Sequence, residues 1–250
     1  MKARSKLGSS TATKITVRGL DLVEDIIGKV GLGDVAFLEL KGRLPTPEES
    51  AVFNAIAVTL VEHGITPSSL AARLTYFGAP EALQGAVAAG LLGMGDRFGG
   101  SIEGAARILQ EELQAASPDA DLRPIARRIV ESHRQSGSLI PGLGHPIHKP
   151  LDPRTPRLFA VAEANGLSGR HVELMQLIAE EATHVYGRAL PVNATGAIAA
   201  IASELEIPWA VTRGLAVMAR AIGLVAHVQE EMSDPIATDV WARADAESSE

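Results

Sequence analysis

Helix-start signals recur along this chain, whereas the alternation of polar and apolar residues that marks a β-strand is almost absent. Thr46-Pro-Glu-Glu49 has the order of a helix N-terminus, with a capping hydroxyl, a proline at the first helical position and acidic residues in the first turn. The same beginning recurs at Thr66-Pro67. We therefore predict an all-α protein. The expected helices begin at 66 and 80 and cover 46–62, 101–116, 121–136, 154–165, 170–187, 194–205 and 208–231.

The two ends of the chain differ from this helical body. Residues 1–14 are rich in serine and threonine and are expected to form a disordered tail, and 243–250 a frayed acidic end. Residues 15–23 could form a short extended piece that leads into a helix. Four segments are rich in alanine and glycine, which indicates either a tight core or a helical subunit interface. They are 51–59, 84–95, 194–202 and 214–226.

Composition excludes several classes of function. The net charge is −7 and there is no basic run, so neither nucleic acid nor an anionic membrane is an expected partner. The absence of cysteine excludes disulfides, thiolate metal sites and cysteine nucleophiles, and is compatible with a cytoplasmic location. Residues 1–14 lack the apolar segment of a secretory signal. Arg213 and Arg220 interrupt the longest apolar stretch, so no membrane span is predicted.

The loop over 141–154 carries the unusual chemistry. It holds four prolines, and its donors and charges, His145, His148, Lys149 and Arg154, lie in one constrained turn. Gly142 and Gly144 would let a ligand touch backbone amides. An arginine can hold a carboxylate through two parallel hydrogen bonds, and a histidine can donate to a carbonyl or alkoxide oxygen. The combination suits a polycarboxylate substrate, and the alternative is a surface loop with incidental charges.

Competing motifs are weak. Gly142-Leu-Gly144 lacks the third glycine and the preceding strand of a dinucleotide site. His145 and His148 lack helical spacing because prolines interrupt them, and no third ligand lies close in the sequence, so we predict no metal. Glu181-Ala-Thr-His184 has the spacing of a di-iron motif, but that motif is needed twice and occurs once.

Gly142-Leu-Gly-His145, followed by Lys149 and by Asp152-Pro-Arg154, resembles the signature segment of the citrate synthase family. The resemblance implies that His145 bonds the carbonyl of oxaloacetate, that Arg154 holds one of its carboxylates and that Lys149 contacts coenzyme A phosphate. The backbone of Gly142, Leu143 and Gly144 would lie near the adenine side.

Two further positions follow from the resemblance. The segment 219–230 is similar to a later family segment whose arginine binds a substrate carboxylate, which corresponds to Arg220. His63 falls where the family has a second histidine that contacts oxaloacetate, although a buried structural histidine is the alternative there.

The family's fold supplies the expected domains. A large helical domain would comprise 15–107 and 189–250, and a smaller inserted helical domain over 108–188 would carry the substrate and coenzyme A loop and close over the ligand.

One departure from the citrate synthase pattern favours a lyase. The family has a histidine before a Gly-Gly pair, and here Phe98 stands there, within Gly95-Asp-Arg-Phe-Gly-Gly100. This run resembles citryl-CoA lyases and the citryl-CoA lyase module of ATP-citrate lyases. Phe98 is therefore predicted to line the substrate site. Because phenylalanine cannot donate a hydrogen bond, it would impair ordinary citrate synthase chemistry.

A second departure concerns the general base. The family places a catalytic aspartate in an Asn-Val-Asp-Gly-like turn, whereas Asn193-Ala-Thr-Gly196 has Thr195 at that point. Threonine is not a base at neutral pH without an activating partner. By resemblance to the lyase module, an aspartate near the C-terminus could replace it. We predict Asp239 before Asp234, the alternative being that both are solvated acids.

These observations predict a citryl-CoA lyase that forms acetyl-CoA and oxaloacetate. No tightly bound cofactor is expected, because coenzyme A enters with the substrate. The partners would be a CoA thioester, an oxaloacetate- or citrate-like polycarboxylate and a second copy of the chain in a homodimer. Two alternatives remain: a condensing enzyme or lyase for another 3-hydroxy-acyl-CoA, and a non-catalytic regulator that binds acyl-CoA or a dicarboxylate.

Overall fold

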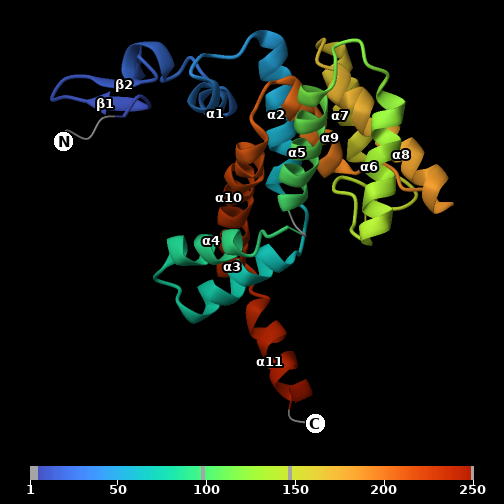
Figure 1. Cartoon of the computed structure of the whole chain (residues 1–250). Helices are drawn as coiled ribbons and strands as arrows, with labels where there is room; N and C mark the ends of the chain where they lie inside the picture. Colours follow the sequence, from blue (N-terminus) through green and yellow to red (C-terminus); the bar gives the residue numbers. More distant parts are fainter. Residues whose placement is uncertain (1–4, 97–98, 146–147, 249–250) are drawn as a thin grey trace, which may run out of the picture.

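The computed structural model in Figure 1 describes residues 5–96, 99–145 and 148–248. Within these ranges most of the chain is helical and the strands are few and short, which confirms the all-α prediction. The helices are α1 (Leu32–Lys41), α2 (Pro47–Val61), α3 (Pro67–Gly78), α4 (Leu83–Leu92), α5 (Gly100–Ala115), α6 (Leu122–Ser136), α7 (Arg154–Ala164), α8 (Arg170–Tyr186), α9 (Ala194–Glu204), α10 (Trp209–Ser233) and α11 (Ala237–Ser248). A short π-helix, η1 (Leu22–Ile26), precedes α1.

The helix-start signals are realised as side-chain caps. At α2, the Glu49 amide donates to the Thr46 hydroxyl at 3.2 Å, and the Thr46 amide donates to the Glu49 carboxylate at 2.8 Å. This reciprocal pair satisfies two backbone donors that the first turn leaves without intrahelical acceptors. Thr66 and Ser69 form the corresponding capping box at α3.

The N-terminal tail differs from expectation where the structure describes it. Gly8–Ser10 forms β1, which pairs antiparallel with β2 (Ile15–Val17), and β2 pairs with β3 (Leu20–Asp21). The Ser9 and Thr16 hydroxyls lie 2.7 Å apart across the first pair, and the Thr11 amide donates to the Lys14 carbonyl at 2.8 Å to close the turn. A serine- and threonine-rich segment can therefore form a strand, because its hydroxyls bond to each other and to the turn.

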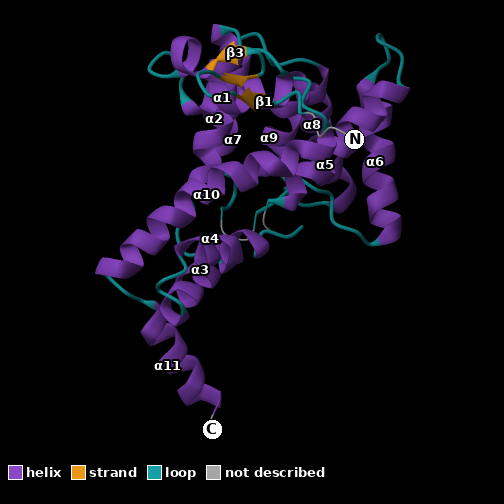
Figure 2. Cartoon of the chain, turned by 90° about the vertical axis from the view of Figure 1, so that its left-hand side faces the viewer, coloured by secondary structure: helices purple, strands orange, loops and turns teal. Residues whose placement is uncertain are grey.

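The C-terminal prediction is corrected as well. Residues 243–248, expected to be frayed, continue α11, where Arg243 donates to Glu247 one turn later at 2.8 Å. The start of α11 is fixed by the buried Glu231, whose carboxylate accepts the backbone amides of Ile236 and Ala237. Figures 1 and 2 show α11 projecting away from the body of the molecule.

The core is centred on α9, whose residues 196–203 are all buried. This helix packs against α5, α7 and α8. Its small side chains allow the close approach, so for the alanine-rich segment 194–202 the tight-core interpretation is the correct one. The large side chains of Phe37, Phe53 and Ile102 close the same core from α1, α2 and α5.

Helix α10 connects the core to the pair formed by α3 and α4 (Figure 2). It is long and apolar enough to cross a membrane by length and composition, but half of the apolar stretch is buried against other helices. It packs on α2, α3, α4 and α5, as a core helix does. Arg220 and His227 are buried on α10, which brings two polar side chains to the region that α2 and α3 enclose.

Candidate active site

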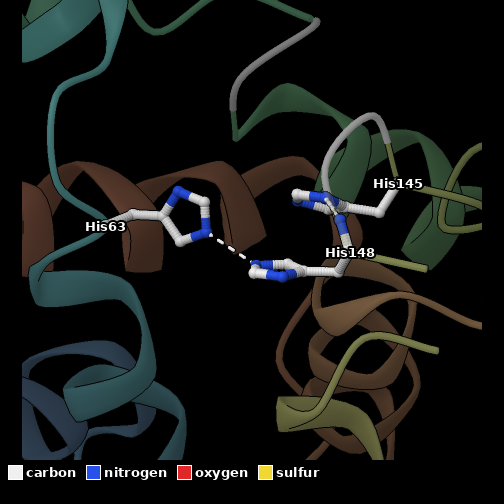
Figure 3. Close-up of side chains that lie close together, drawn as sticks. All are labelled: His63, His145 and His148. Carbon is white, nitrogen blue, oxygen red and sulfur yellow. Dashed lines mark hydrogen bonds between the residues drawn. The ribbon is translucent and has the colours of Figure 1, made fainter. Parts of the chain in front are cut away.

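Three histidines from two distant parts of the chain meet in front of α10 (Figure 3). His63 follows α2, and His145 and His148 come from the loop between α6 and α7. The Nε2 atoms of His63 and His148 lie 3.2 Å apart and are hydrogen-bonded. The rings of His145 and His148 are stacked with centroids 4.4 Å apart, and the His63 ring lies 5.8 Å from that of His145. The structure thus brings His63 to the loop that the sequence singled out.

The loop is held in place by its own backbone. Gly142 and Gly144 have φ angles of +85° and +68°, which favour glycine. The Gly144 amide donates to the Pro191 carbonyl at 2.8 Å, and the Asn193 amide donates to the Gly142 carbonyl at 2.9 Å. Leu143 forms a bridge with Val192 between them. The Gly144 amide was expected to be available to a ligand, but it is used to fix the loop, and coenzyme A contact at Gly142, Leu143 and Gly144 stays a prediction.

Arg154 is oriented by a buried carboxylate two residues earlier. Its Nε and Nη2 donate to the two oxygens of Asp152 at 3.0 and 2.8 Å. The Asp152 side chain also accepts the backbone amide of Ala194 at 3.0 Å, so it ties Arg154 to the start of α9. Burial raises the pKa of the Asp152 carboxyl, but the hydrogen bonds from Arg154 and Ala194 outweigh it and hold that pKa at about 2. Asp152 is therefore ionised at neutral pH, and its two oxygens hold the edge of the Arg154 guanidinium formed by Nε and Nη2.

Arg220 presents a buried donor to the same region. The side chain is 9% exposed, and its Nη1 is buried and has no hydrogen-bond partner within the described part of the chain. The pKa of the Arg220 guanidinium is lowered, mainly by burial. The carboxylate of Glu62 opposes this shift and the charge of Arg154 adds to it. An unpaired buried guanidinium nitrogen is costly for a free protein, which indicates that an anion completes its hydrogen bonding.

Burial and neighbouring positive charges keep His63 and His145 uncharged. Burial lowers the pKa of His63, and the charges of Arg154, His148 and Arg220 lower it further. Burial also lowers the pKa of His145, with His148 and Arg154 acting in the same direction and Asp152 opposing them. His63 and His145 are therefore uncharged imidazoles at neutral pH. They can donate or accept a hydrogen bond without the cost of burying a charge.

The hydrogen bonding of His145 defines its tautomer. The backbone amide of His148 donates to Nδ1 of His145 at 3.0 Å. A neutral imidazole that accepts at Nδ1 carries its proton on Nε2. His145 therefore carries its N–H at Nε2, the type of group that bonds a carbonyl or alkoxide oxygen.

The ring nitrogens of the three histidines lie within 4.8 Å of one another, a spacing that could hold a metal ion. Sequence reasoning found no third ligand because His63 is remote in the chain and only folding supplies it. However, the charges of Arg154 and Arg220 that disfavour imidazolium also disfavour a dication. The donor set with its two cations fits an anion better, so the prediction of no metal stands as a prediction.

The remaining predicted residues are placed less directly. Lys149 is exposed beside the cluster. Thr195 lies in the first turn of α9, where its hydroxyl donates to the side chain of the N-cap residue Asn193 at 2.6 Å and accepts from Ser101 at 3.0 Å. Asp239 is exposed in the first turn of the projecting α11, so the structure does not bring it together with the histidines. Phe98 lies outside the described residues.

Sequence reasoning missed the carboxylates around the site. Asp152 stands in the Asp-Pro-Arg motif, two residues before Arg154. This spacing is a local signal that the carboxylate can pair with the guanidinium. Glu62 accepts the backbone amide of His63 at 2.8 Å and lies 3.1 Å from Nε2 of the buried His227. No local pattern announces this contact, because His227 is far along the chain.

Comparison with known proteins shows the family to which the fold belongs. The family described as "Citrate synthase, C-terminal domain" matches residues 35–239. A structure of citryl-CoA lyase from Hydrogenobacter thermophilus is 35% identical, with a TM-score of 0.83 over 93% of this chain and 88% of that one. ATP citrate lyase from Methanosaeta concilii (D541A mutant, in complex with (3S)-citryl-CoA) has a TM-score of 0.79 at 22% identity over 93% of this chain and 39% of that one, and shows the fold alone.

Among curated relatives, ATP-citrate synthase beta chain protein 1 from Arabidopsis thaliana is 29% identical over 84% of this chain. The chain spans only 36% of the length of that relative. The helical fold is that of the citrate synthase family. This chain belongs to the citrate synthase family.

Proposed function

We propose that this protein is a citryl-CoA lyase, which cleaves citryl-CoA to acetyl-CoA and oxaloacetate. The single observation that carries the proposal is the buried, unpartnered Nη1 of Arg220, which lies in one region with Arg154 and the neutral donors His63 and His145. Two cations and two neutral imidazoles match a substrate with several carboxylates and one oxygen that changes between hydroxyl and carbonyl. The 35% identity to a citryl-CoA lyase over most of both chains supports the same reaction.

The residues take the following roles. Arg154, held from behind by Asp152, binds one carboxylate, and Arg220 binds another through its free donor. The Nε2–H of His145 donates to the tertiary hydroxyl oxygen and stabilises it as it becomes the carbonyl oxygen of oxaloacetate. His63 lies in the same cluster, hydrogen-bonded to His148. Lys149, exposed on the loop, binds coenzyme A phosphate, and Phe98 is assigned to the substrate-binding residues.

Coenzyme A enters as part of the substrate, and no further cofactor is required by these steps. The small domain over 108–188 closes on the ligand because it carries the loop 141–154. Closure excludes water from the enolate that the bond cleavage generates. The reaction takes place in the cytoplasm.

A homodimer is part of the proposal, and α10 provides a surface for it. Five apolar side chains follow one another on this helix at intervals of seven, four, three and seven residues, so they share a face. They are Val211, Met218, Ile222, Val225 and Met232, exposed by 42, 39, 50, 46 and 54%. Sedimentation velocity should give twice the mass of one chain, and Ile222→Glu should give the single-chain mass.

The activity is tested by incubating the purified protein with citryl-CoA and following oxaloacetate through malate dehydrogenase and NADH. His145→Ala is the matched variant. Release of oxaloacetate by the wild-type protein but not by His145→Ala supports the lyase function and the role of His145. No release, with coenzyme A binding intact by calorimetry, rejects it. Turnover of a different 3-hydroxy-acyl-CoA would then favour the related enzyme, and binding without any turnover would favour the regulator.

A further inference from the structure

The proposed cleavage needs a group that removes the proton of the tertiary hydroxyl. Thr195, at the position of the family's aspartate, is occupied: its hydroxyl donates to Asn193 and accepts from Ser101. Asp239 is exposed in the first turn of the projecting α11. Neither oxygen is offered to a ligand that lies between Arg154 and Arg220.

His145 does not meet this need at Nε2. Its Nδ1 accepts the His148 amide, so the proton is on Nε2 and that nitrogen donates. A nitrogen that donates a hydrogen bond to the substrate oxygen cannot take a proton from the same oxygen. A second nitrogen must therefore act.

The pair formed by His63 and His148 contains such a nitrogen. Their Nε2 atoms are hydrogen-bonded at 3.2 Å, and in a hydrogen bond between two ring nitrogens one donates and the other accepts. The accepting nitrogen holds a lone pair in the plane of its ring. The His148 ring is stacked on that of His145 with the centroids 4.4 Å apart, so a lone pair on Nε2 of His148 would lie beside an oxygen bound by His145.

We infer that His148, paired with His63, is the catalytic base that replaces the missing aspartate; this rests on the proposed lyase function. A substrate hydroxyl that enters between the two rings donates to the accepting Nε2 in place of the other imidazole. The charged groups that face the pair are Arg154 from α7, Arg220 from α10 and Asp152 from the loop. His63 remains neutral among them, because burial and the two arginines lower its pKa.

The proton and electrons balance without an added reactant. The base nitrogen takes the hydroxyl proton, and the O–H electron pair forms the new carbonyl bond of oxaloacetate. The bond between the hydroxyl-bearing carbon and the methylene next to the thioester breaks, and its electrons form the enolate of acetyl-CoA. The imidazolium returns its proton to the methylene carbon, which becomes the methyl group of acetyl-CoA. The base nitrogen then holds its lone pair again.

The test compares His148→Gln and His148→Ala with wild type in the oxaloacetate assay, with His184→Gln as the control because His184 is exposed on α8. We expect kcat to fall about 100- to 10,000-fold in both variants, with KM changed less than about 3-fold and with the control unchanged. Added imidazole should restore part of the rate of His148→Ala, and the restored rate should rise with the concentration of the unprotonated imidazole. A merely structural role for His148 would not produce this rescue.

Three outcomes are distinct. A fall in kcat in both His148 variants, with rescue of His148→Ala by imidazole, supports His148 as the base. Full activity in His148→Gln overturns the assignment of His148 as the base but leaves the lyase function intact. The same conclusion holds if Asp239→Asn loses activity while His148→Gln keeps it. Absence of oxaloacetate with wild type rejects the lyase itself, and the base with it. Circular dichroism and calorimetric binding of coenzyme A show whether each variant is folded.

Discussion

Gly142 and Gly196 cross so closely that a Cβ atom at Gly142 would lie 2.7 Å from the Cα of Gly196. Gly196 belongs to α9, the buried centre of the core, and Gly142 belongs to the loop that carries His145. The position of the loop 141–154 is therefore set by direct backbone contact with the buried helix α9. Two glycines make this contact possible, one of them with a positive φ angle.

Gly142→Ala is expected to destabilise the protein far more than Gly137→Ala. Gly137 also has a positive φ angle, of +68°, but nothing would lie near its Cβ, so its substitution should cost about 1–2 kcal/mol. Gly142→Ala adds overpacking of about 1–3 kcal/mol. Urea denaturation of both variants measures the difference. Equal losses would show that the crossing does not fix the loop.

Asp152→Asn should lower the free energy of unfolding in a pH-dependent manner. The Asp152 pKa is about 2 in the folded protein against an ordinary 3.8, so its contribution is present above about pH 4 and is lost as the pH falls toward 2. We expect the difference in unfolding free energy between wild type and variant to shrink by about 2 kcal/mol from pH 5 to pH 2. Denaturant titrations at several pH values test this. Asp96→Asn, at an exposed ion pair, should show a change below about 0.5 kcal/mol.

The sequence predicted the helices and the central loop well, because both depend on local signals. Prolines and capping residues define α2 and α3, and the loop motif gathers His145 and Arg154 within ten residues. What local signals could not supply is long-range pairing. The contact of His63 with His148 and the Glu62–His227 contact depend on how distant segments meet.

Two errors have the same physical origin. The serine- and threonine-rich residues 8–10 and the acidic residues 243–248 have compositions of solvated ends. Hydroxyl pairing orders the first, and anchoring of α11 at Glu231 orders the second. Glu231 is in turn held by Arg73, a fully buried arginine on α3, with its Nη1 donating at 2.9 Å. Composition alone does not reveal such an anchor.

Arg220→Met should separate function from stability. Removing a buried donor without a partner should leave the free energy of unfolding unchanged within about 1 kcal/mol or raise it. Loss of a charged hydrogen bond to substrate should lower kcat/KM about 100-fold. Arg127→Met, at an exposed ion pair on α6, is the control and should match wild type in activity. A large loss of stability in Arg220→Met would mean that this arginine serves the fold.

Removal of metal should leave the rate unchanged. The three histidines have ligand spacing, but Arg154 and Arg220 disfavour a dication there. Dialysis against EDTA, followed by elemental analysis and the oxaloacetate assay, tests this expectation. Loss of activity on dialysis that zinc or another divalent ion restores would place a metal on His63, His145 and His148.

The most direct test of the central claim is product stoichiometry from citryl-CoA. Enzyme in excess is mixed with citryl-CoA without ATP or added metal, and the quenched mixture is analysed by mass spectrometry. A citryl-CoA lyase yields one acetyl-CoA and one oxaloacetate for each citryl-CoA consumed, with no citrate formed. Citrate and free coenzyme A as the products would show thioester hydrolysis and would contradict the lyase.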